Sequence, residues 1–219
     1  MGNGRSSGLP RGVKNTTSKV YTIWNSQKDS EKDLSVDIDK WNARKSQASH
    51  DALHKYTGSF YKTSNPILRA SDLKGMSAAE VMANISKNES SSFVQWVKDM
   101  DKGLNAYENT VPFVGYRGAG YSLLGGTKTF DQLKAMVGKT VHDTGHMSIS
   151  TVSGHEFDGK VLYEVKVPTG KGIGAYIGKL SHYHSEAEFL FNRGTIFKIT
   201  KVRKQGNKPV VTLEVYGRY

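Results

Sequence analysis

Apolar residues recur at intervals of three and four along the first half of the chain, the spacing that buries one face of an α-helix. After Ser91 the apolar stripe consists of Phe93, Trp96, Val97, Met100 and Leu104. Further upstream, Ser77 and Glu80 have the spacing of a capping box, which marks the start of a helix. We therefore predict that the chain from Trp24 to about Tyr107 is mainly helical.

The second half consists of short runs rich in β-branched and aromatic residues, separated by Gly, Pro, Asn or Asp. These runs are HMSIST, VLYEVKVP, GIGAYIG, EAEFLFN, IFKITKVRK and KPVVTLEVY. Before them, VPFVGYRGAG predicts a strand that ends in a tight turn at Arg117. One helix interrupts the strands, with Thr129 and Gln132 as a capping box and Gly138 at its end. We predict mostly antiparallel sheet here, without the glycine-rich βαβ unit of a Rossmann fold.

This division predicts an α+β protein with one folded domain over residues 20–219, mainly helical over 20–110 and mainly β over 111–219. Residues 1–19 are rich in Gly, Ser and basic residues, and we expect a flexible leader. Gly2 and Ser6 fit the loose N-myristoylation pattern, which mass spectrometry of Gly2 would test. No apolar run approaches the ~20 residues of a membrane span or resembles a secretory signal peptide, so we expect a soluble chain.

The charge balance bears on the partners. The chain has 31 Lys and Arg against 20 Asp and Glu, a net charge of +11, which favours nucleic acid, acidic protein surfaces, membranes or a phosphate-bearing cofactor. The absence of cysteine excludes disulfides, Cys-ligated zinc and thiol catalysis. The histidines include two close pairs, but neither has a third ligand at a plausible spacing, so we predict no metal site. The pairs are His142 with His146, and His182 with His184, which a strand would place on one face.

Two carboxylates two residues apart open the apolar run EAEFLFN. On a strand, Glu186, Glu188 and Leu190 would lie on the same face because side chains alternate. Taken alone, a solvent-exposed Glu pair is the ordinary explanation, since Glu is mostly exposed. The upstream arginine in YRG and the serines in HMSIST change that interpretation.

In this order and spacing, Arg117, Ser148 and the pair Glu186 and Glu188 resemble the arginine, serine, glutamate signature of bacterial mono-ADP-ribosyltransferase toxins, the exoenzyme family that includes binary actin-modifying toxins. KWNARKSQASHDALHKYTGSFYKTSNPILR resembles the family's N-terminal helical segment, and VKVPTGKGIGAYIG with EAEFLFNRGTIFKI resembles its C-terminal strands. The resemblance implies N-terminal helices packed on two roughly perpendicular antiparallel β-sheets. It also implies NAD as the substrate in the cleft between them, with no metal.

The resemblance assigns Arg117, with Tyr116 beside it, to NAD binding, and places the Gly118 backbone against the nicotinamide ring. The chemistry suits these residues, because a guanidinium is a planar, permanently charged fork for phosphate and glycine permits close backbone approach. Ser148 also contacts NAD in this scheme and holds the catalytic carboxylate in place, as a hydroxyl can donate to it without neutralising it. Where the family usually has Ser-Thr-Ser this chain has Ile149 in the middle, which we expect to point away from both serines.

The same resemblance gives the two carboxylates different roles. Glu188 grips the nicotinamide ribose and stabilises positive charge as the glycosidic bond opens, a logic shared with glycoside hydrolysis. Glu186 positions and deprotonates the acceptor, and family members with Glu rather than Gln at this position mostly modify arginine. Tyr183, just before it, would face the target protein or pack its own loop. Phe157 is expected in the core rather than on nicotinamide, and its loop offers only Lys160 to phosphate.

The predicted function is transfer of ADP-ribose from NAD to an arginine of a target protein, with release of nicotinamide. The resemblance implies a toxin or effector that is secreted or delivered into a target cell. It could act alone, with a delivery component or as part of a larger parent protein. A phage origin is compatible with the resemblance. Actin is the most familiar target in the family. Three alternatives remain at this stage: an NAD glycohydrolase, transfer to nucleic acid, and a basic nucleic-acid-binding module without catalysis. The last should interleave exposed aromatics with basic residues, whereas the apolar spacing here is typical of a core.

Overall fold

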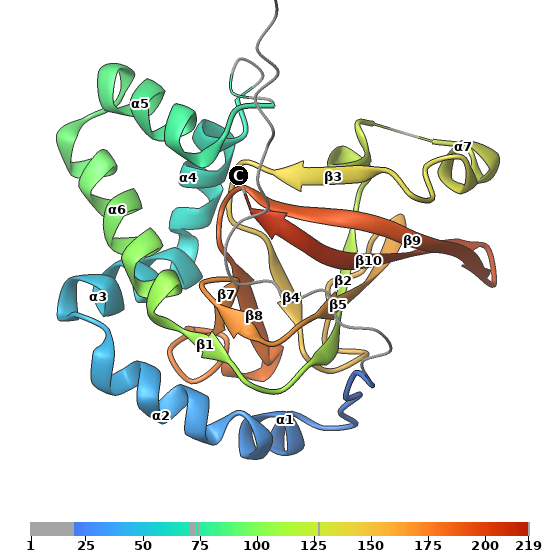
Figure 1. Ribbon diagram of the computed structural model, residues 1–219, viewed down its shortest axis with the longest axis horizontal. Coiled ribbons are helices and arrows are strands. Elements are labelled where there is room, and N and C mark those ends of the chain that lie inside the picture. The colour runs from blue at the N-terminus through green and yellow to red at the C-terminus, as the bar shows by residue number, and fades with distance from the viewer. Residues whose placement is uncertain (1–19, 71–72, 74, 127, 219) are drawn as a thin grey trace, which may run out of the picture.

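The computed structural model describes residues 20–70, 73, 75–126 and 128–218, so the expected leader lies outside the described residues. In this part of the chain the helices before the sheet are α1 (Gln27–Asp33), α2 (Ser35–Arg44), α3 (Gln47–Lys55), α4 (Tyr61–Leu68), α5 (Ala78–Asn88) and α6 (Ser91–Ala106), with a π-helical turn, η1 (Tyr56–Phe60), between α3 and α4. They wrap around one side of the strands (Figure 1). Among the described helices, none combines the length and the hydropathy needed to cross a membrane.

The two strongest helix predictions are confirmed. Ser77 and Glu80 form a complete capping box at the start of α5. The predicted stripe of α6 is its buried face, and two tryptophans fasten that face to its neighbours. Trp96 Nε1 on α6 donates to the Ala52 carbonyl of α3 at 3.1 Å, and Trp41 Nε1 on α2 donates to the Gly103 carbonyl of α6 at 2.8 Å. Helices α2, α3 and α6 are therefore packed against one another.

The strands are β1 (Glu108–Asn109), β2 (Phe113–Ala119), β3 (Thr140–Asp143), β4 (Ser148–Ser150), β5 (Val161–Val167), β6 (Gly170–Lys171), β7 (Gly174–Tyr176), β8 (Glu188–Phe191), β9 (Thr195–Gln205) and β10 (Lys208–Arg218). Short helices lie between them: η3 (Ser122–Leu124), α7 (Phe130–Lys134) and η4 (His184–Glu186). In the described chain the main strand order is β3-β9-β10-β5-β2-β4-β8-β7, and β1 pairs with β6. Of the pairs, β5 with β10 is parallel and the others are antiparallel. The capping box of Thr129 and Gln132 on α7 is confirmed.

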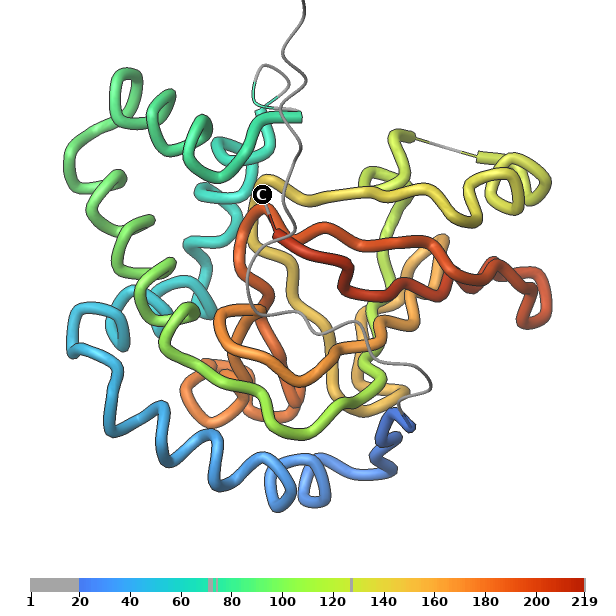
Figure 2. The backbone as a smooth tube through the Cα atoms, viewed as in Figure 1, coloured from blue at the N-terminus to red at the C-terminus, as the bar shows by residue number. Residues whose placement is uncertain are grey.

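A narrow junction divides these strands into two sheets. Strands β2 and β5 pair along their whole shared length, but in the described chain β2 pairs with β4 only at Tyr116 opposite Ser150. On one side lie β3, β9, β10, β5 and β2, and on the other lie β4, β8 and β7. The long β9–β10 hairpin extends away from the N-terminal helices, whereas β7 and β8 lie close to them (Figure 2). The predicted α+β class with a two-sheet core is confirmed.

A chain of buried phenylalanines joins the two sheets. Phe113 on β2 meets Phe189 on β8 with ring centroids 5.3 Å apart, Phe189 meets Phe191 at 5.3 Å, and Phe191 meets Phe197 on β9 at 5.1 Å, all edge to face. All four side chains are fully buried. Each such aromatic pair contributes about 1 kcal/mol beyond its buried area. This packing sets where β2, β8 and β9 stand relative to one another.

Three local predictions were wrong. Arg117 does not end its strand, because β2 continues to Ala119. Glu186 does not share a strand face with Glu188, because Glu186 ends the short helix η4 and Ala187 adopts a left-handed conformation with φ of 47° before β8 begins. His182 and His184 likewise lie outside any strand. The carbonyl of Ala187 accepts a hydrogen bond from the Thr151 backbone at 2.9 Å, a tertiary contact that holds this reversal of the chain.

Candidate active site

Arg117, Ser148 and Glu188 come together from the neighbouring strands β2, β4 and β8. Arg117 Nη1 donates to the Ser148 carbonyl at 2.7 Å and to its hydroxyl at 3.3 Å. The Ser148 hydroxyl also forms a hydrogen bond with the Glu188 carboxylate. Ile149 between the serines is buried against Gly115, as expected for the opposite face. The side chains of Arg117, Ser148 and Glu188 line one cavity of about 610 Å³.

Glu188 is a buried carboxylate with an unusually high pKa. Its side chain is 7% exposed, and burial raises the pKa of Glu188 to about 7, with a further contribution from the negative charge of Glu186. That pKa is lowered in part by hydrogen bonds from Ser148 and Ser181 and by the positive charge of Arg117. Glu188 therefore carries a proton for much of the range below neutrality, and a cation placed beside it would favour the ionised form.

Glu186 stands at the edge of the same cavity in a more open environment. Its side chain is half-buried, and partial burial raises the pKa of Glu186 above its usual range. Tyr183, which is 52% exposed, also borders the cavity, and its carbonyl accepts from the Glu186 backbone N–H at 3.1 Å. The segment before β8 thus presents one carboxylate and one phenol at the rim, with Glu188 deeper inside.

Ser181 is a site residue that no sequence pattern indicated. It is 1% exposed, and its hydroxyl oxygen accepts a hydrogen bond from the Tyr183 backbone N–H at 3.1 Å. A serine hydroxyl has one proton to donate, and here that proton is available for its hydrogen bond to the Glu188 carboxylate. Ser181 therefore links the rim segment to the buried carboxylate. A loop serine carries no sequence signal for such a role.

Arg69 is the second residue that sequence reasoning missed. It lines the cavity that holds Glu188 and also an adjoining cavity of about 450 Å³, and Arg117 borders both as well. Arg69 Nε and Nη2 donate to the two carboxylate oxygens of Asp143 at 2.7 and 2.8 Å. Burial opposes the charge on Arg69, but the Asp143 carboxylate outweighs it and raises the pKa of Arg69. Asn65 lies on α4 and Arg69 caps the C-terminus of that helix, and their spacing of four residues was the available signal.

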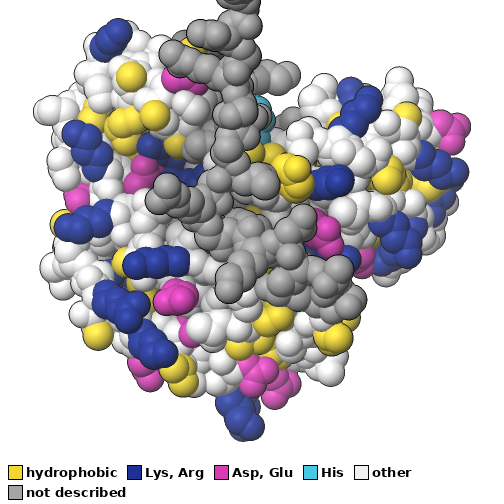
Figure 3. Space-filling model, viewed as in Figure 1, with side chains coloured by type: hydrophobic (Ala, Val, Ile, Leu, Met, Phe, Trp, Pro, Cys, Tyr) yellow, Lys and Arg dark blue, Asp and Glu magenta, His cyan; other side chains and the backbone are white. Residues whose placement is uncertain are grey.

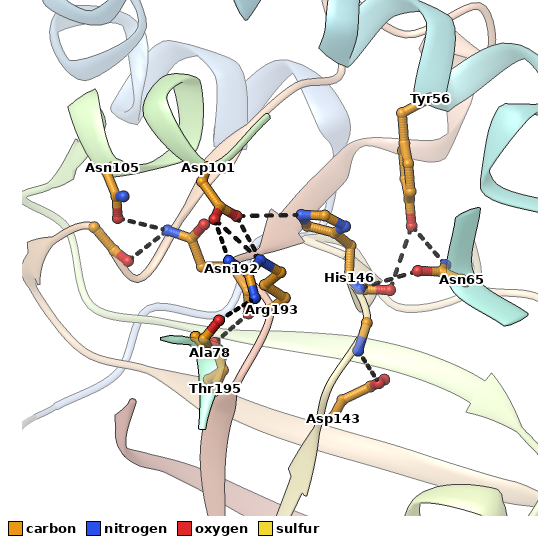
Figure 4. A network of polar contacts seen from close by, with 12 residues as sticks. Tyr56, Asn65, Ala78, Asp101, Asn105, Asp143, His146, Asn192, Arg193 and Thr195 are labelled. Carbon is orange, nitrogen blue, oxygen red and sulfur yellow. Dashed lines mark hydrogen bonds and ion pairs between the residues drawn. The ribbon is translucent and has the colours of Figure 1, made fainter. Parts of the chain in front are cut away.

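A hydrogen-bonded network in the cavity wall holds Arg69 in place. Figure 4 shows the part of this network that Tyr56, Asn65 and His146 form. The His146 carbonyl accepts from Arg69 Nη2 at 2.7 Å and from the Tyr56 hydroxyl at 3.3 Å. Asn65 closes the network, donating to the Tyr56 hydroxyl and accepting from the His146 backbone N–H, each at 3.0 Å. The His146 ring is fully buried, and burial lowers the pKa of His146 to about 4. Its Nε2 lies 4.0 Å from Asp101, too far for a hydrogen bond that would offset the effect of burial on this pKa.

Phe157 does not lie in the core, contrary to expectation. It is 66% exposed and borders the cavity, because the backbone of its loop packs directly on β2 at Gly118. A Cβ on Gly118 would lie 1.7 Å from the Phe157 carbonyl oxygen, so this glycine permits a close approach within the protein. Tyr116 does not line either large cavity, but it borders a narrow cleft of about 20 Å³ together with Arg117 and Phe157. Lys160 is exposed and borders neither large cavity.

The two-sheet core packed against N-terminal helices defines the class of protein: the fold is that of an ADP-ribosyltransferase. The sequence pattern of the ADP-ribosyltransferase exoenzyme family matches residues 22–216, and the chain belongs to that family. It is therefore an NAD-dependent ADP-ribosyltransferase of the bacterial toxin type. Among the described residues, no group of three or more His, Asp or Glu side chains is placed to hold a metal ion.

Solved structures share this fold at low sequence identity. The C3 exoenzyme of Clostridium limosum is 19% identical with a TM-score of 0.74, over 90% of this chain and 98% of that one. A protein from S. aureus, solved with NAD, is 18% identical with a TM-score of 0.73, over 90% and 99%. The enzymatic component C2-I of the Clostridium botulinum C2 toxin is 18% identical with a TM-score of 0.66, and the match covers 89% of this chain but 48% of C2-I. No curated protein matches the chain.

Proposed function

We propose that the protein transfers ADP-ribose from NAD to an arginine side chain of a target protein and releases nicotinamide. The observation that carries this proposal is the unequal placement of two carboxylates on one cavity: Glu188 is buried beside Ser148 and Arg117, and Glu186 is at the rim. A buried carboxylate suits the bond-breaking step, and a rim carboxylate suits an acceptor that arrives from solution.

The two adjoining cavities suit NAD in size and in chemistry. They measure about 610 and 450 Å³ and share Arg69 and Arg117 as lining residues, so two guanidiniums stand where the cavities meet. Arg117 can hold a phosphate through its guanidinium, and the charge of Arg69, which its ion pair with Asp143 partly offsets, adds to the attraction for the second phosphate. The larger cavity would then take the nicotinamide riboside, with Glu188 inside and the exposed ring of Phe157 at its edge.

In the first step the bond between the nicotinamide nitrogen and the ribose C1′ breaks, and nicotinamide leaves with the electron pair. Glu188 stabilises the positive charge that develops on the ribose and accepts a hydrogen bond from its hydroxyl. Ser148 and Ser181 hold the Glu188 carboxylate from two sides without neutralising it. The cationic nicotinamide of bound NAD favours the ionised form of Glu188, which the reaction requires.

In the second step a nitrogen of the target arginine attacks C1′ and forms the new C–N bond. A guanidinium is protonated at neutral pH and is a poor nucleophile in that form, so a carboxylate must both orient it and accept a proton. Glu186 is the carboxylate at the rim, and partial burial raises its pKa and makes it a better base than a fully solvated Glu. Tyr183 beside it offers an exposed aromatic surface to the target.

For the target and the route of delivery we propose a class rather than a particular protein or pathway. The target is a protein with an exposed arginine, and actin is one candidate. C2-I is described as the enzymatic component of a toxin, and this chain spans about half its length. By analogy, we propose that this enzyme is secreted or delivered into the target cell, either with a delivery component or as part of a larger protein.

The test uses NAD labelled in the ADP-ribose portion, a cell lysate, and three variants. Glu186→Gln should abolish protein labelling while most NAD hydrolysis remains, and Glu188→Gln should abolish both. The matched control is Glu89→Gln, at a position that borders neither cavity, and it should behave as the parent. Mass spectrometry of the labelled protein should place ADP-ribose on arginine.

Other results would replace the proposal. Nicotinamide release without labelled protein would make the enzyme a glycohydrolase, and a label lost on nuclease treatment would make nucleic acid the acceptor. Labelling that persists in Glu188→Gln would refute the assigned catalytic role.

A further inference from the structure

The positive charge of the protein is concentrated at one end of the fold. Residues 128–139 and 198–208 contain eight Lys or Arg and one Asp. The rest of the chain from residue 20 onwards contains nineteen Lys or Arg and nineteen Asp or Glu. The entire charge excess of residues 20–219 therefore belongs to two short segments.

These two segments lie together in space. Helix α7 packs against β9, and the β9–β10 hairpin projects beside it (Figure 1). Lys134 from α7 and Lys204 from β9 both lie over the ring of Phe130, each 4.8 Å from its centroid. Backbone hydrogen bonds join Gly138 to Ile199 and Ile199 to Lys139, at 2.7 and 2.9 Å. We call this the α7–β9 basic surface; it consists of Lys128, Lys134, Lys139, Lys198, Lys201, Arg203, Lys204 and Lys208.

Half of these basic side chains are exposed, and most of the eight have no acidic partner within the described chain. Salt bridges neutralise Arg203, through Glu164, and Lys208, through Asp158. Lys134, Lys139, Lys201 and Lys204 are exposed, and no ion pair engages them among the described residues. Several dark blue side chains lie on the lobe that α7 and the hairpin form, and others lie on the helical side of the molecule (Figure 3). No member of the surface lines the NAD cavities, so substrate binding does not account for it.

We propose that the α7–β9 basic surface binds an anionic lipid surface. The unpaired cations are all lysines, which are hydrated point charges suited to a diffuse array of headgroups, whereas the arginine that could grip a phosphate bidentately is already paired. Val137 and Tyr216, 46% and 48% exposed, supply an apolar and an amphipathic side chain at the same end.

Nucleic acid fits this surface less well. Single strands bind by stacking bases on open aromatic rings between basic residues. Here two lysines cover the Phe130 ring, and Lys198 lies 5.8 Å from the Tyr216 centroid. Because the catalytic cavities lie outside the basic surface, a lipid-bound enzyme keeps them available to NAD and to the target.

The experiment measures sedimentation of the full chain, expressed in bacteria, with vesicles of phosphatidylcholine alone and with about one third phosphatidylserine. The parent should bind the anionic vesicles and release them at high salt. The variant Lys134→Gln, Lys201→Gln, Lys204→Gln should lower the partition coefficient about 100-fold, at about fivefold for each charge. Its NAD hydrolysis should match the parent, which also reports correct folding.

A matched control separates the surface from the net charge of the molecule. Lys87, Lys98 and Lys102 on α5 and α6 are exposed, and replacing all three with Gln removes the same charge. This control should bind as the parent does. Equal weakening of both triple variants, or no preference of the parent for anionic vesicles, would overturn the proposal. Salt-sensitive binding to a DNA or RNA duplex without vesicle binding would assign the surface to nucleic acid instead.

Discussion

The raised pKa of Glu188 predicts a defined pH dependence of NAD cleavage. Its folded pKa of about 7 lies well above the ordinary 4.5, which corresponds to about 3 kcal/mol in favour of the protonated carboxyl. Because the reaction needs the ionised form, kcat/KM for NAD hydrolysis should reach a plateau above pH 7. Because kcat/KM follows the ionisation of Glu188 in the free enzyme, it should be about tenfold lower at pH 6 and about 100-fold lower at pH 5.

Three variants test whether Glu188 is the group that titrates. Glu186→Gln removes a neighbouring negative charge and should move the inflection to lower pH, whereas Ser181→Ala removes a hydrogen bond to the carboxylate and should move it to higher pH. Ser185→Ala, an exposed serine in the same loop, is the control and should leave the inflection unchanged. Nicotinamide release measured across pH 5 to 8 gives all four profiles.

The opposite signs make the outcome decisive. A general loss of packing in the loop would lower kcat/KM at every pH without displacing the inflection in opposite directions. A flat profile for the parent, or variants that both shift the inflection the same way, would refute the assignment of Glu188 as a buried, titrating catalytic carboxylate.

Two further predictions concern stability. Gly118→Ala should destabilise the fold by about 1 to 3 kcal/mol, because the added Cβ would lie 1.7 Å from the Phe157 carbonyl oxygen. The control Gly120→Ala, whose Cβ would have nothing within 4 Å, should leave the stability unchanged. Thermal unfolding compares the two variants. Between pH 4.5 and 6.5 the folded chain holds a proton on Glu188 that the unfolded chain has lost. Over the same range the folded chain lacks a proton on His146 that the unfolded chain holds. The two groups therefore make opposite and cancelling contributions to the pH dependence of the free energy of unfolding. In Glu188→Gln the free energy of unfolding should therefore rise with pH, relative to the parent, by about 1.4 kcal/mol per unit in urea denaturation; a constant difference would contradict the buried, protonated state.

The features that the sequence predicted correctly depend on contacts within a few residues. The capping boxes of Ser77 and Thr129 close within one turn, and the stripe of α6 follows from helical spacing. The alternating runs predicted strands for the same reason. The expectation that Arg117, Ser148 and Glu188 meet came from resemblance to a family, because no local pattern brings together residues so far apart in the chain.

Tertiary structure decided the properties that give the site its chemistry. Glu186 and Glu188 do face one cavity, but through the left-handed turn at Ala187 rather than through strand alternation, which is why periodicity misplaced them. Phe157 is exposed because a neighbouring strand offers a glycine against its backbone. Sequence by itself determined the helices, the strands and the residue types available for catalysis. Burial, which depends on every element packed around a side chain, raises the pKa of Glu188 to about 7, and the packing of separate elements brings Arg69 to the same cavity and Ser181 next to the Glu188 carboxylate.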